Sequence, residues 1–254
     1  MTTTTDKDPL GTRMKEQYER RAATYLPRRT FTIVRLDGKA FHTYTRGLDK
    51  PFDQQLMDDM SATTKYLCEE VEGAVFGYTQ SDEISLLLTD FAQPKTEAFF
   101  NGAVQKIVSV TASLTTAFFN KLRPGKLAFF DSRVFTIPDP VEVANYFIWR
   151  QRDATRNSVS MAAQSVYSHK ELHGKSTNEM QEMLFQKGIN WNDYPVRFRR
   201  GTSIERQTVT GPVTYVHKRT GETIATDTVT RRVWSVEEPG IFTVDSFKPV
   251  KGAA

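Results

Sequence analysis

The amino-acid sequence predicts an α+β fold whose core is an antiparallel sheet of split βαββαβ topology. An apolar, β-branched stretch of strand length, 31–36, and a further stretch that reads as a strand, 127–137, flank a strand–turn–strand segment at 74–88. Two longer stretches with apolar residues at helical spacing, 53–72 and 97–122, separate these strands. The order strand, helix, strand, strand, helix, strand is that of the split βαββαβ motif, with both helices on one face of the sheet.

The chain of 254 residues is long enough for a substantial core. With 39% hydrophobic and 25% charged residues, its composition is that of an ordinary globular protein. We find no internal repeat and no linker that divides the chain. We therefore expect a catalytic core over 1–139, with a helical and β-strand extension over 140–254 packed on it as one integrated unit.

Charge and cysteine content exclude several classes of protein. Lys and Arg number 34 against 30 Asp and Glu, and this net charge of +4 permits a nucleic-acid partner without requiring one. The single Cys68 excludes an internal disulfide, and one Cys with four scattered His argues against a zinc site. No apolar run is long enough to span a membrane, and residues 1–6 lack the apolar core of a signal peptide. A cytoplasmic protein without a membrane partner is therefore expected.

The first elements follow from local composition. Residues 2–5 are a polar, low-complexity start that is expected to be disordered, and residues 14–23 are a good helix former. Residues 41–50 have the composition of a loop. Asp53 is expected to cap the helix that runs to about residue 72.

Turn residues delimit the later elements. The helix over 97–122 ends at Pro124-Gly125, and the strand over 127–137 is expected to bulge at Asp131-Ser132. Pro140 begins a helix that is expected to reach about residue 170.

A further helix over 178–187 follows two candidate caps, Ser176 and Thr177. Residues 202–244 alternate Thr and Val, which predicts meandering strands. The expected breaks between these strands lie at Gly211-Pro212 and Thr220-Gly221.

Two acidic turns indicate a metal site. The first strand stops at Asp37-Gly38, and a residue without a Cβ lets the backbone approach a ligand. The turn of the following hairpin carries Asp82 and Glu83. If this hairpin pairs beside the first strand, Asp37 and Asp82 converge. Acidic residues on adjacent strands are how nucleotidyl transferases hold two Mg²⁺ ions.

Seven short motifs in register resemble the tRNA-His guanylyltransferase family, the enzymes that add nucleotides in the 3′-to-5′ direction. The resemblance covers roughly residues 30 to 206. The motifs are RLDGKAFH at 35–42, KPFD at 50–53, QSDE at 80–83, FDSRV at 130–134, WRQ at 149–151, GINWN at 188–192 and RGT at 200–202.

The resemblance implies a polymerase-palm-like fold and a nucleotidyltransferase that extends tRNA 5′ ends. In this family the 3′-hydroxyl of an incoming GTP or other NTP attacks an activated 5′-phosphate of the RNA. A 5′-triphosphate, or adenylylation of a 5′-monophosphate by ATP, supplies the activation. Two Mg²⁺ ions assist, one acting on the attacking hydroxyl and one on the triphosphate. A homotetramer is also implied.

The resemblance also implies roles for individual residues. The implied catalytic residues are Asp37, Asp82 and Glu83, although Glu83 either binds metal or orients the cluster from behind it. The implied metal ligands are Asp37, the Gly38 carbonyl and Asp82. The implied nucleotide-binding residues are Asp37, Gly38, Lys39, Ala40, Phe41, His42, Lys50, Ser81 and Asp82.

Basic and aromatic residues farther along the chain suggest an RNA-binding surface. Arg150, Arg152 and Arg156 share part of a helix surface, and we expect them with Arg199 and Arg200 to follow an RNA backbone. The alternative is a solvated face with internal ion pairs. Trp149 and Trp191 suit either base stacking or core packing, and Asp131 is either a third palm carboxylate or a partner of Arg133.

One departure from the family pattern bears on specificity. Eukaryotic members follow Trp-Arg-Gln with His-Ile-Asn-Asn, a sequence tied to adding guanosine opposite a non-pairing base. Here residues 153–158 read DATRNS, which is similar to the bacterial, archaeal and phage branch that repairs truncated tRNA 5′ ends by templated addition. Two alternatives stay open, a nucleotide cyclase acting on free NTP and a non-catalytic RNA-binding module.

Overall fold

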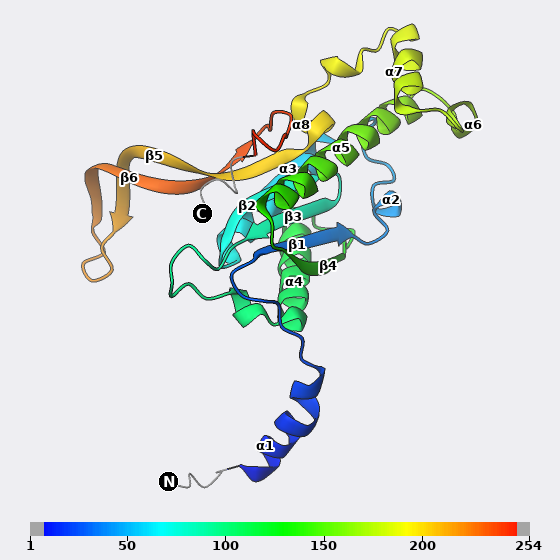
Figure 1. The fold of residues 1–254 in the computed structure, drawn as a ribbon. Coiled ribbons are helices and arrows are strands. Elements are labelled where there is room, and N and C mark those ends of the chain that lie inside the picture. The colour runs from blue at the N-terminus through cyan, green and yellow to red at the C-terminus, as the bar shows by residue number, and fades with distance from the viewer. Residues whose placement is uncertain (1–7, 248–254) are drawn as a thin grey trace.

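A computed structural model describes residues 8–247. Residues 2–5, for which a disordered start was predicted, lie outside this range. Six antiparallel strands form one sheet in the order β4-β1-β3-β2-β5-β6 (Figure 1). The strands are β1 Phe31–Gly38, β2 Ala74–Gln80, β3 Glu83–Leu88, β4 Phe130–Ile137, β5 Thr202–Val216 and β6 Thr223–Glu237. Helices α3 (Gln54–Glu70) and α4 (Val104–Leu122) make the crossovers, so the predicted βαββαβ core is confirmed.

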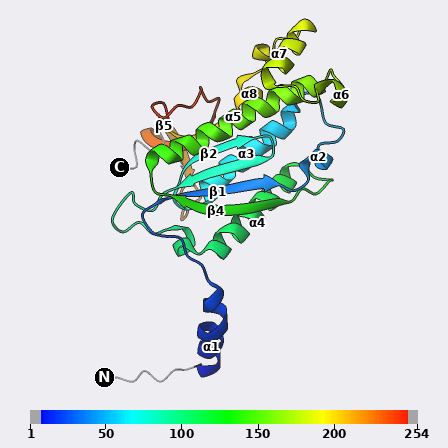
Figure 2. The same ribbon diagram turned by 45° about the vertical axis from the view of Figure 1, so that its right-hand side comes forward.

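Alternation along β1 sorts its side chains between two cores, because successive residues of a strand point to opposite faces. Val34 and Leu36 are buried with residues of α3 and α4, whereas Phe31 and Ile33 are buried with residues of α5 (Pro140–Gln164). Figure 2 shows α5 crossing the sheet on the face opposite α4. The face that carries Asp37 is therefore the face that α5 covers.

Asp53 and Ser176 cap helices as predicted, and Pro140 lies in the first turn of its helix as predicted. The Asp53 carboxylate accepts from the Leu56 N–H at 2.7 Å, and α3 begins at the next residue. Asp139 caps α5, which has Pro140 in its first turn. Of the two candidate caps for α7 (Thr177–Gln186), Ser176 is the one used, in a capping box with Glu179.

Several boundaries differ from prediction. The first helix begins earlier, at α1 (Pro9–Met14), and continues as a π-helix and a 3₁₀ turn to Ala22. The helix expected from residue 97 begins at Val104, because Phe100 and Asn101 have left-handed backbones with φ of 47° and 51°. The short helix α2 (Phe41–Tyr44) stands in the predicted loop.

The strand and helix predictions near residues 131 and 170 are also corrected. The predicted bulge at Asp131-Ser132 is wrong, since pairing of β4 with β1 runs without a shift from Phe31↔Ile137 to Gly38↔Phe130. The helix expected to reach residue 170 ends at Gln164, and the separate α6 (His169–Leu172) follows.

The predicted meander over 202–244 is a single long hairpin. Strands β5 and β6 pair from Ser203↔Glu237 to Val216↔Thr223, with only a register shift at Pro212-Val213 where a break was expected. The break expected at Thr220-Gly221 is the hairpin turn. Figure 1 shows this hairpin reaching away from the body of the molecule, as α1 does at the other end of the chain. Within residues 8–247, no helix is both long and apolar enough to cross a bilayer.

Candidate active site

The end of β1 and the turn between β2 and β3 form the candidate site. Asp37 lies opposite Glu83 on one side and opposite Asp131 on the other. The Gly38 N–H donates to the Asp82 carbonyl at 3.2 Å, which ties the strand end to the hairpin turn. The hairpin of β2 and β3 therefore pairs beside β1, which is the condition under which the sequence predicted that Asp37 and Asp82 converge.

Asp82 is held in a setting that disfavours its charge. Ser81 and Asp82 are the two residues that connect β2 to β3, and Ser81 has a left-handed φ of 51°. Burial and then the negative charge of Asp37 raise the pKa of Asp82, while hydrogen bonds from its own backbone and from Ser81 oppose this rise. Two like charges held close together are stabilised by a divalent cation between them.

The carboxylates of Asp37 and Asp82 suit a Mg²⁺ ion whose remaining ligands come from substrate phosphates and water. Among residues 8–247, no group of three or more His, Cys, Asp and Glu side chains is arranged to hold a metal. Mg²⁺ is commonly bound by one or two carboxylates together with substrate phosphates and water. Asp37 and Asp82 supply two carboxylates and no complete cage, which matches that mode of binding.

The predicted nucleotide loop is anchored from below by an aromatic core. The Phe41 side chain is 5% exposed and packs against Tyr44, Phe119 and Phe130, so only its backbone can face a nucleotide. Ala40 has a left-handed backbone, with φ of 55°, at the start of α2.

The charged members of this loop are accessible. The side chains of Lys39, His42 and Lys50 are exposed, and the Lys39 N–H donates to the Phe129 carbonyl at 2.8 Å. The first turn of a helix has N–H groups without intrahelical partners, which favours an anion at this position.

Gly38 allows the loop to lie against this core. A Cβ at Gly38 would come within 2.2 Å of the Phe41 ring. We therefore expect Gly38→Ala to lower the free energy of unfolding by about 1–3 kcal/mol, because the ring must move, and to weaken NTP binding. Urea denaturation and nucleotide titration measure the two effects. Gly211→Ala is the matched control, since nothing lies within 4 Å of its Cβ position, and an equal loss there would contradict the steric argument.

Glu83 faces two arginines. Its buried carboxylate accepts from Arg150 Nη1 at 2.8 Å and 3.2 Å and from the Arg35 guanidinium. Burial raises the pKa of Glu83, and the charges of Arg150 and Arg35 partly offset this rise. We infer that Glu83 acts as a positioning residue behind Asp82 and does not bind metal, which was one of the two roles expected from the sequence.

The predicted RNA-binding arginines are not equivalent. Arg150 is 3% exposed and paired with Glu83, so its expected role on an RNA backbone is wrong. Arg152 is exposed, and Arg156 is exposed and paired with Asp153. Arg199 is half-buried and donates to the Tyr194 carbonyl at 2.7 Å. Arg200 is also half-buried.

One residue of the site, Arg35, was given no role from the sequence, whereas Arg133 was an expected partner of Asp131. Arg35 holds Glu83, and Arg133 lies 3.4 Å from Asp131 and 4.0 Å from Asp37. The pairing of Asp131 with Arg133 was one of its two expected roles. A charged residue at an inward-facing position of an apolar strand is the signal that could have identified Arg35.

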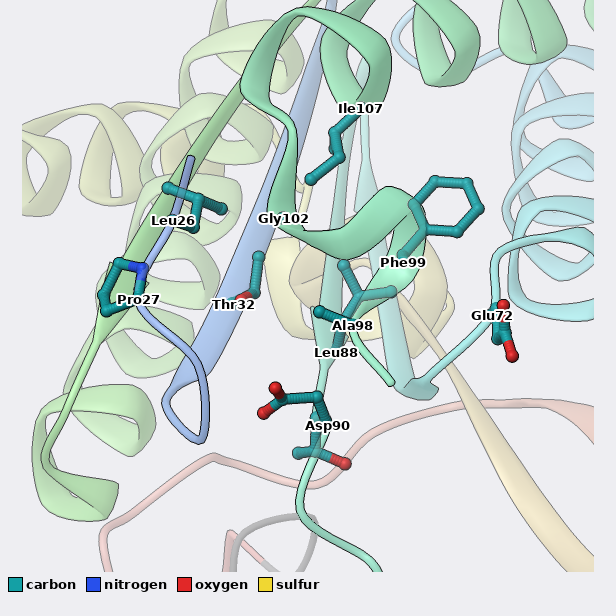
Figure 3. Close-up of a pocket in the computed structure, with 11 residues that line it drawn as sticks. Leu26, Pro27, Thr32, Glu72, Leu88, Asp90, Ala98, Phe99, Gly102 and Ile107 are labelled. Carbon is teal, nitrogen blue, oxygen red and sulfur yellow. The ribbon is translucent and has the colours of Figure 1, made fainter. Parts of the chain in front are cut away.

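A small cavity lies at the other end of β1 from this site. Its volume is about 20 Å³, enough for about one water molecule. Figure 3 shows Thr32, Leu88 and Asp90 among its lining residues. Thr32 pairs with Leu88 at the opposite end of β1 from Asp37, and the cavity contains none of the predicted site residues.

A βαββαβ sheet with acidic residues at the ends of adjacent central strands defines the class of palm-type nucleotidyl-transfer proteins. Comparison with known proteins makes this assignment specific. The family model described as tRNAHis guanylyltransferase matches residues 11–138. This chain belongs to the tRNA-His guanylyltransferase family.

Solved structures and a curated relative agree with this family. A bacterial tRNA(His) guanylyltransferase-like protein in complex with ATP is 41% identical, with a TM-score of 0.82, over 96% of this chain and 98% of that one. The corresponding complex with GTP is 40% identical, with a TM-score of 0.79 and the same coverage. The tRNA(His) guanylyltransferase of Saccharomyces cerevisiae is 28% identical over 70% of this chain and 83% of its own length.

Proposed function

We propose that this protein is a metal-dependent nucleotidyltransferase that repairs tRNA 5′ ends by templated addition of nucleotides in the 3′-to-5′ direction. The observation that carries the proposal is the meeting of Asp37 and Asp82 at one end of the sheet. The family supports tRNA as the acceptor, and the ATP and GTP complexes of the similar bacterial protein support nucleoside triphosphates as substrates.

Asp37, Asp82 and the Gly38 carbonyl would hold two Mg²⁺ ions together with the triphosphate of the incoming nucleotide. When bound, the metal lowers the pKa of the attacking hydroxyl and neutralises charge on the phosphates. The protein's own side chains position the metal-binding turn and the triphosphate. Glu83, clamped by Arg35 and Arg150, fixes the turn that carries Asp82, and exposed Lys39, His42 and Lys50 provide positive charge for the triphosphate.

Templating is supported by what residues 153–158 do in the fold. Asp153 pairs with Arg150 at 3.5 Å and with Arg156. The Thr155 hydroxyl donates to the Arg199 carbonyl, and the buried Ser158 hydroxyl accepts from the Trp191 indole N–H at 3.1 Å. Most polar side chains of this stretch are therefore occupied within the protein, which supports selection of the nucleotide by base pairing with the acceptor strand.

The test compares two truncated tRNAs that differ only in the base opposite the missing nucleotide, C or A. Pairing holds the incoming hydroxyl in line with the activated phosphate, and placement of this kind supplies much of a catalyst's rate. We expect kcat/KM for GTP to be about 5- to 150-fold higher opposite C than opposite A, because discrimination of about 1–3 kcal/mol between the right and the wrong base corresponds to that ratio.

The matched arm repeats the comparison with UTP, for which A is the better template. A preference for GTP opposite both bases would reject templated repair and indicate a guanosine-specific enzyme. Intact tRNA-His should be a poor acceptor for an additional guanosine opposite a non-complementary base.

Arg152 and Arg156 are the exposed arginines on α5 that we assign to the RNA backbone, with half-buried Arg199 and Arg200 beyond them. A homotetramer in the cytoplasm is the expected state, based on the family. Exposed Leu10 and Tyr18 on the projecting N-terminal segment support contacts between subunits.

A further inference from the structure

Trp149 is an exposed tryptophan beside the active site. Its relative exposure is 48%, whereas the other two tryptophans of the chain, Trp191 and Trp234, are 8% and 9% exposed. The Arg35 guanidinium lies 5.9 Å from the centroid of the Trp149 ring. Arg35 precedes Asp37 by two residues on the same face of β1, so the ring is close to the acidic pair.

The ring is held rigidly from one side. The Arg150 guanidinium lies over it at 3.4 Å from the centroid, and the Tyr146 ring meets it at 6.0 Å with an interplanar angle of 66°. The Nε atoms of Arg150 and Arg35 are buried without a hydrogen-bond partner, which agrees with packing against an aromatic face. The Arg150 guanidinium therefore covers part of the ring, and the 48% of Trp149 that is exposed remains accessible to a planar ligand.

Trp149 borders two open hollows. One, of about 460 Å³, is lined by Ile137, Pro138, Tyr146 and Trp149 together with Asp139 and Glu142. The other, of about 440 Å³, is lined by Ile148, Trp149 and Phe242 together with Arg152. Each hollow has room for a nucleobase and its ribose, with apolar walls that suit a flat ring.

Charge distinguishes the two hollows. Arg152 gives the second hollow a positive wall, whereas Asp139 and Glu142 make the first one acidic. A phosphate backbone would therefore pass on the Arg152 side. Small ligands usually bind in a pocket that encloses them. A base in a polynucleotide can bind in a more open site, because adjacent nucleotides of the same strand also contact the protein. The open hollows thus favour a base of RNA over a free nucleotide.

We propose that Trp149 is a stacking platform for an RNA base next to the 5′ end under repair, with Arg152 contacting the adjoining phosphate. This inference rests on the proposed function and names a contact with the acceptor. The arrangement also connects RNA to catalysis, because Trp149 stacks on Arg150, which holds Glu83 next to Asp82. A base seated on the ring would stabilise the clamp that positions the acidic turn.

The test uses the fluorescence of Trp149 in the full-length protein. A truncated tRNA should quench its emission and protect it from acrylamide, whereas GTP or ATP with Mg²⁺ but no RNA should not. Trp149→Phe should abolish the RNA-dependent change while retaining most of the binding.

Trp149→Ala should raise the Kd for tRNA about 5- to 150-fold, the range measured for removal of one base–aromatic stack, with the Kd for GTP unchanged. Rescue by phenylalanine separates stacking from a general loss of structure. Phe185→Ala is the matched control. Phe185 is 67% exposed beside another hollow, but the charged residue lining that hollow is Glu182, so tRNA affinity should stay the same.

An unchanged Trp149 signal with tRNA demonstrably bound would overturn the platform and leave the proposed function intact. Equal quenching by GTP or ATP alone would overturn its assignment to RNA. Absence of both tRNA binding and nucleotide addition would reject the proposed function itself, and the platform with it.

Discussion

Asp82→Asn is expected to reduce nucleotide addition by a factor on the order of 10³ or more, because metal assistance supplies several kcal/mol of transition-state stabilisation. Asparagine keeps the size of the side chain and removes the charge that a divalent cation requires. Single-turnover addition of GTP to a truncated tRNA measures the effect. Asp37→Asn should give the same loss, since both carboxylates serve one cluster.

The metal-free stability of the same variant provides an independent check. The pKa of Asp82 is raised in the folded protein, so its ionised form costs folding free energy above the ordinary pKa of aspartate. Asparagine avoids this cost, and the variant should be no less stable than wild type. Mg²⁺ with GTP should raise the Tm of wild type and not that of the variant, because a ligand stabilises only the state that binds it.

Asp131→Asn is the matched comparison for this pair. The Asp131 carboxylate lies on the strand next to Asp37, but it is 56% exposed and paired with Arg133. We expect activity to fall less than about tenfold, since an exposed ion pair is worth about 0–1 kcal/mol. Retention of near wild-type activity by Asp82→Asn would rule out the two-carboxylate site, and a complete loss in Asp131→Asn would add a third ligand.

Arg150→Ala is expected to lower the free energy of unfolding by about 3–5 kcal/mol, the usual result of removing one partner of a buried ion pair. Arg150 is 3% and Glu83 is 5% exposed, so the charge that remains on Glu83 is poorly solvated and is balanced by Arg35 alone. Urea denaturation measures the change. Nucleotide addition should also fall, because Glu83 adjoins the Asp82 turn.

A double variant, Arg150→Met with Glu83→Gln, removes both charges and should recover most of the stability without restoring activity. Arg152→Ala is the control two residues away on α5. Its side chain is exposed, so stability should change by less than about 0.5 kcal/mol. If Arg150→Ala and Arg152→Ala were equally stable, the ion pair with Glu83 would not hold the fold together.

Much of the fold and of the acidic site could be predicted from sequence because the signals are local. Alternation in β1, helical spacing in α4 and the Asp53 cap all depend on residues a few positions apart. The acidic turns at Asp37 and Asp82 were recognisable for the same reason, since each is a short motif on a strand end.

The burial of Arg150 and its ion pair with Glu83 were not predicted from the sequence motif that contains it. It was grouped with Arg152 and Arg156 as a basic surface, although Val143, Phe147 and Ala154 place it on the buried stripe of α5. Helical spacing could have predicted its burial. It could not have predicted the ion pair, because Glu83 lies 67 residues away on another element.

The sequence by itself determined the βαββαβ core, the Asp53 cap, the family and the two acidic turns, since each depends on neighbouring residues. Only the tertiary structure decided which charges face solvent and how residues 202–237 pair. Pro212, expected to break the strand, is tolerated because β2 pairs with β5 only at residues 202–204. Beyond that point one edge of β5 has no neighbouring strand among the described residues, so a proline without an N–H costs little there. Pairing partners and exposed edges are properties of the assembled sheet, which no single stretch of the chain specifies.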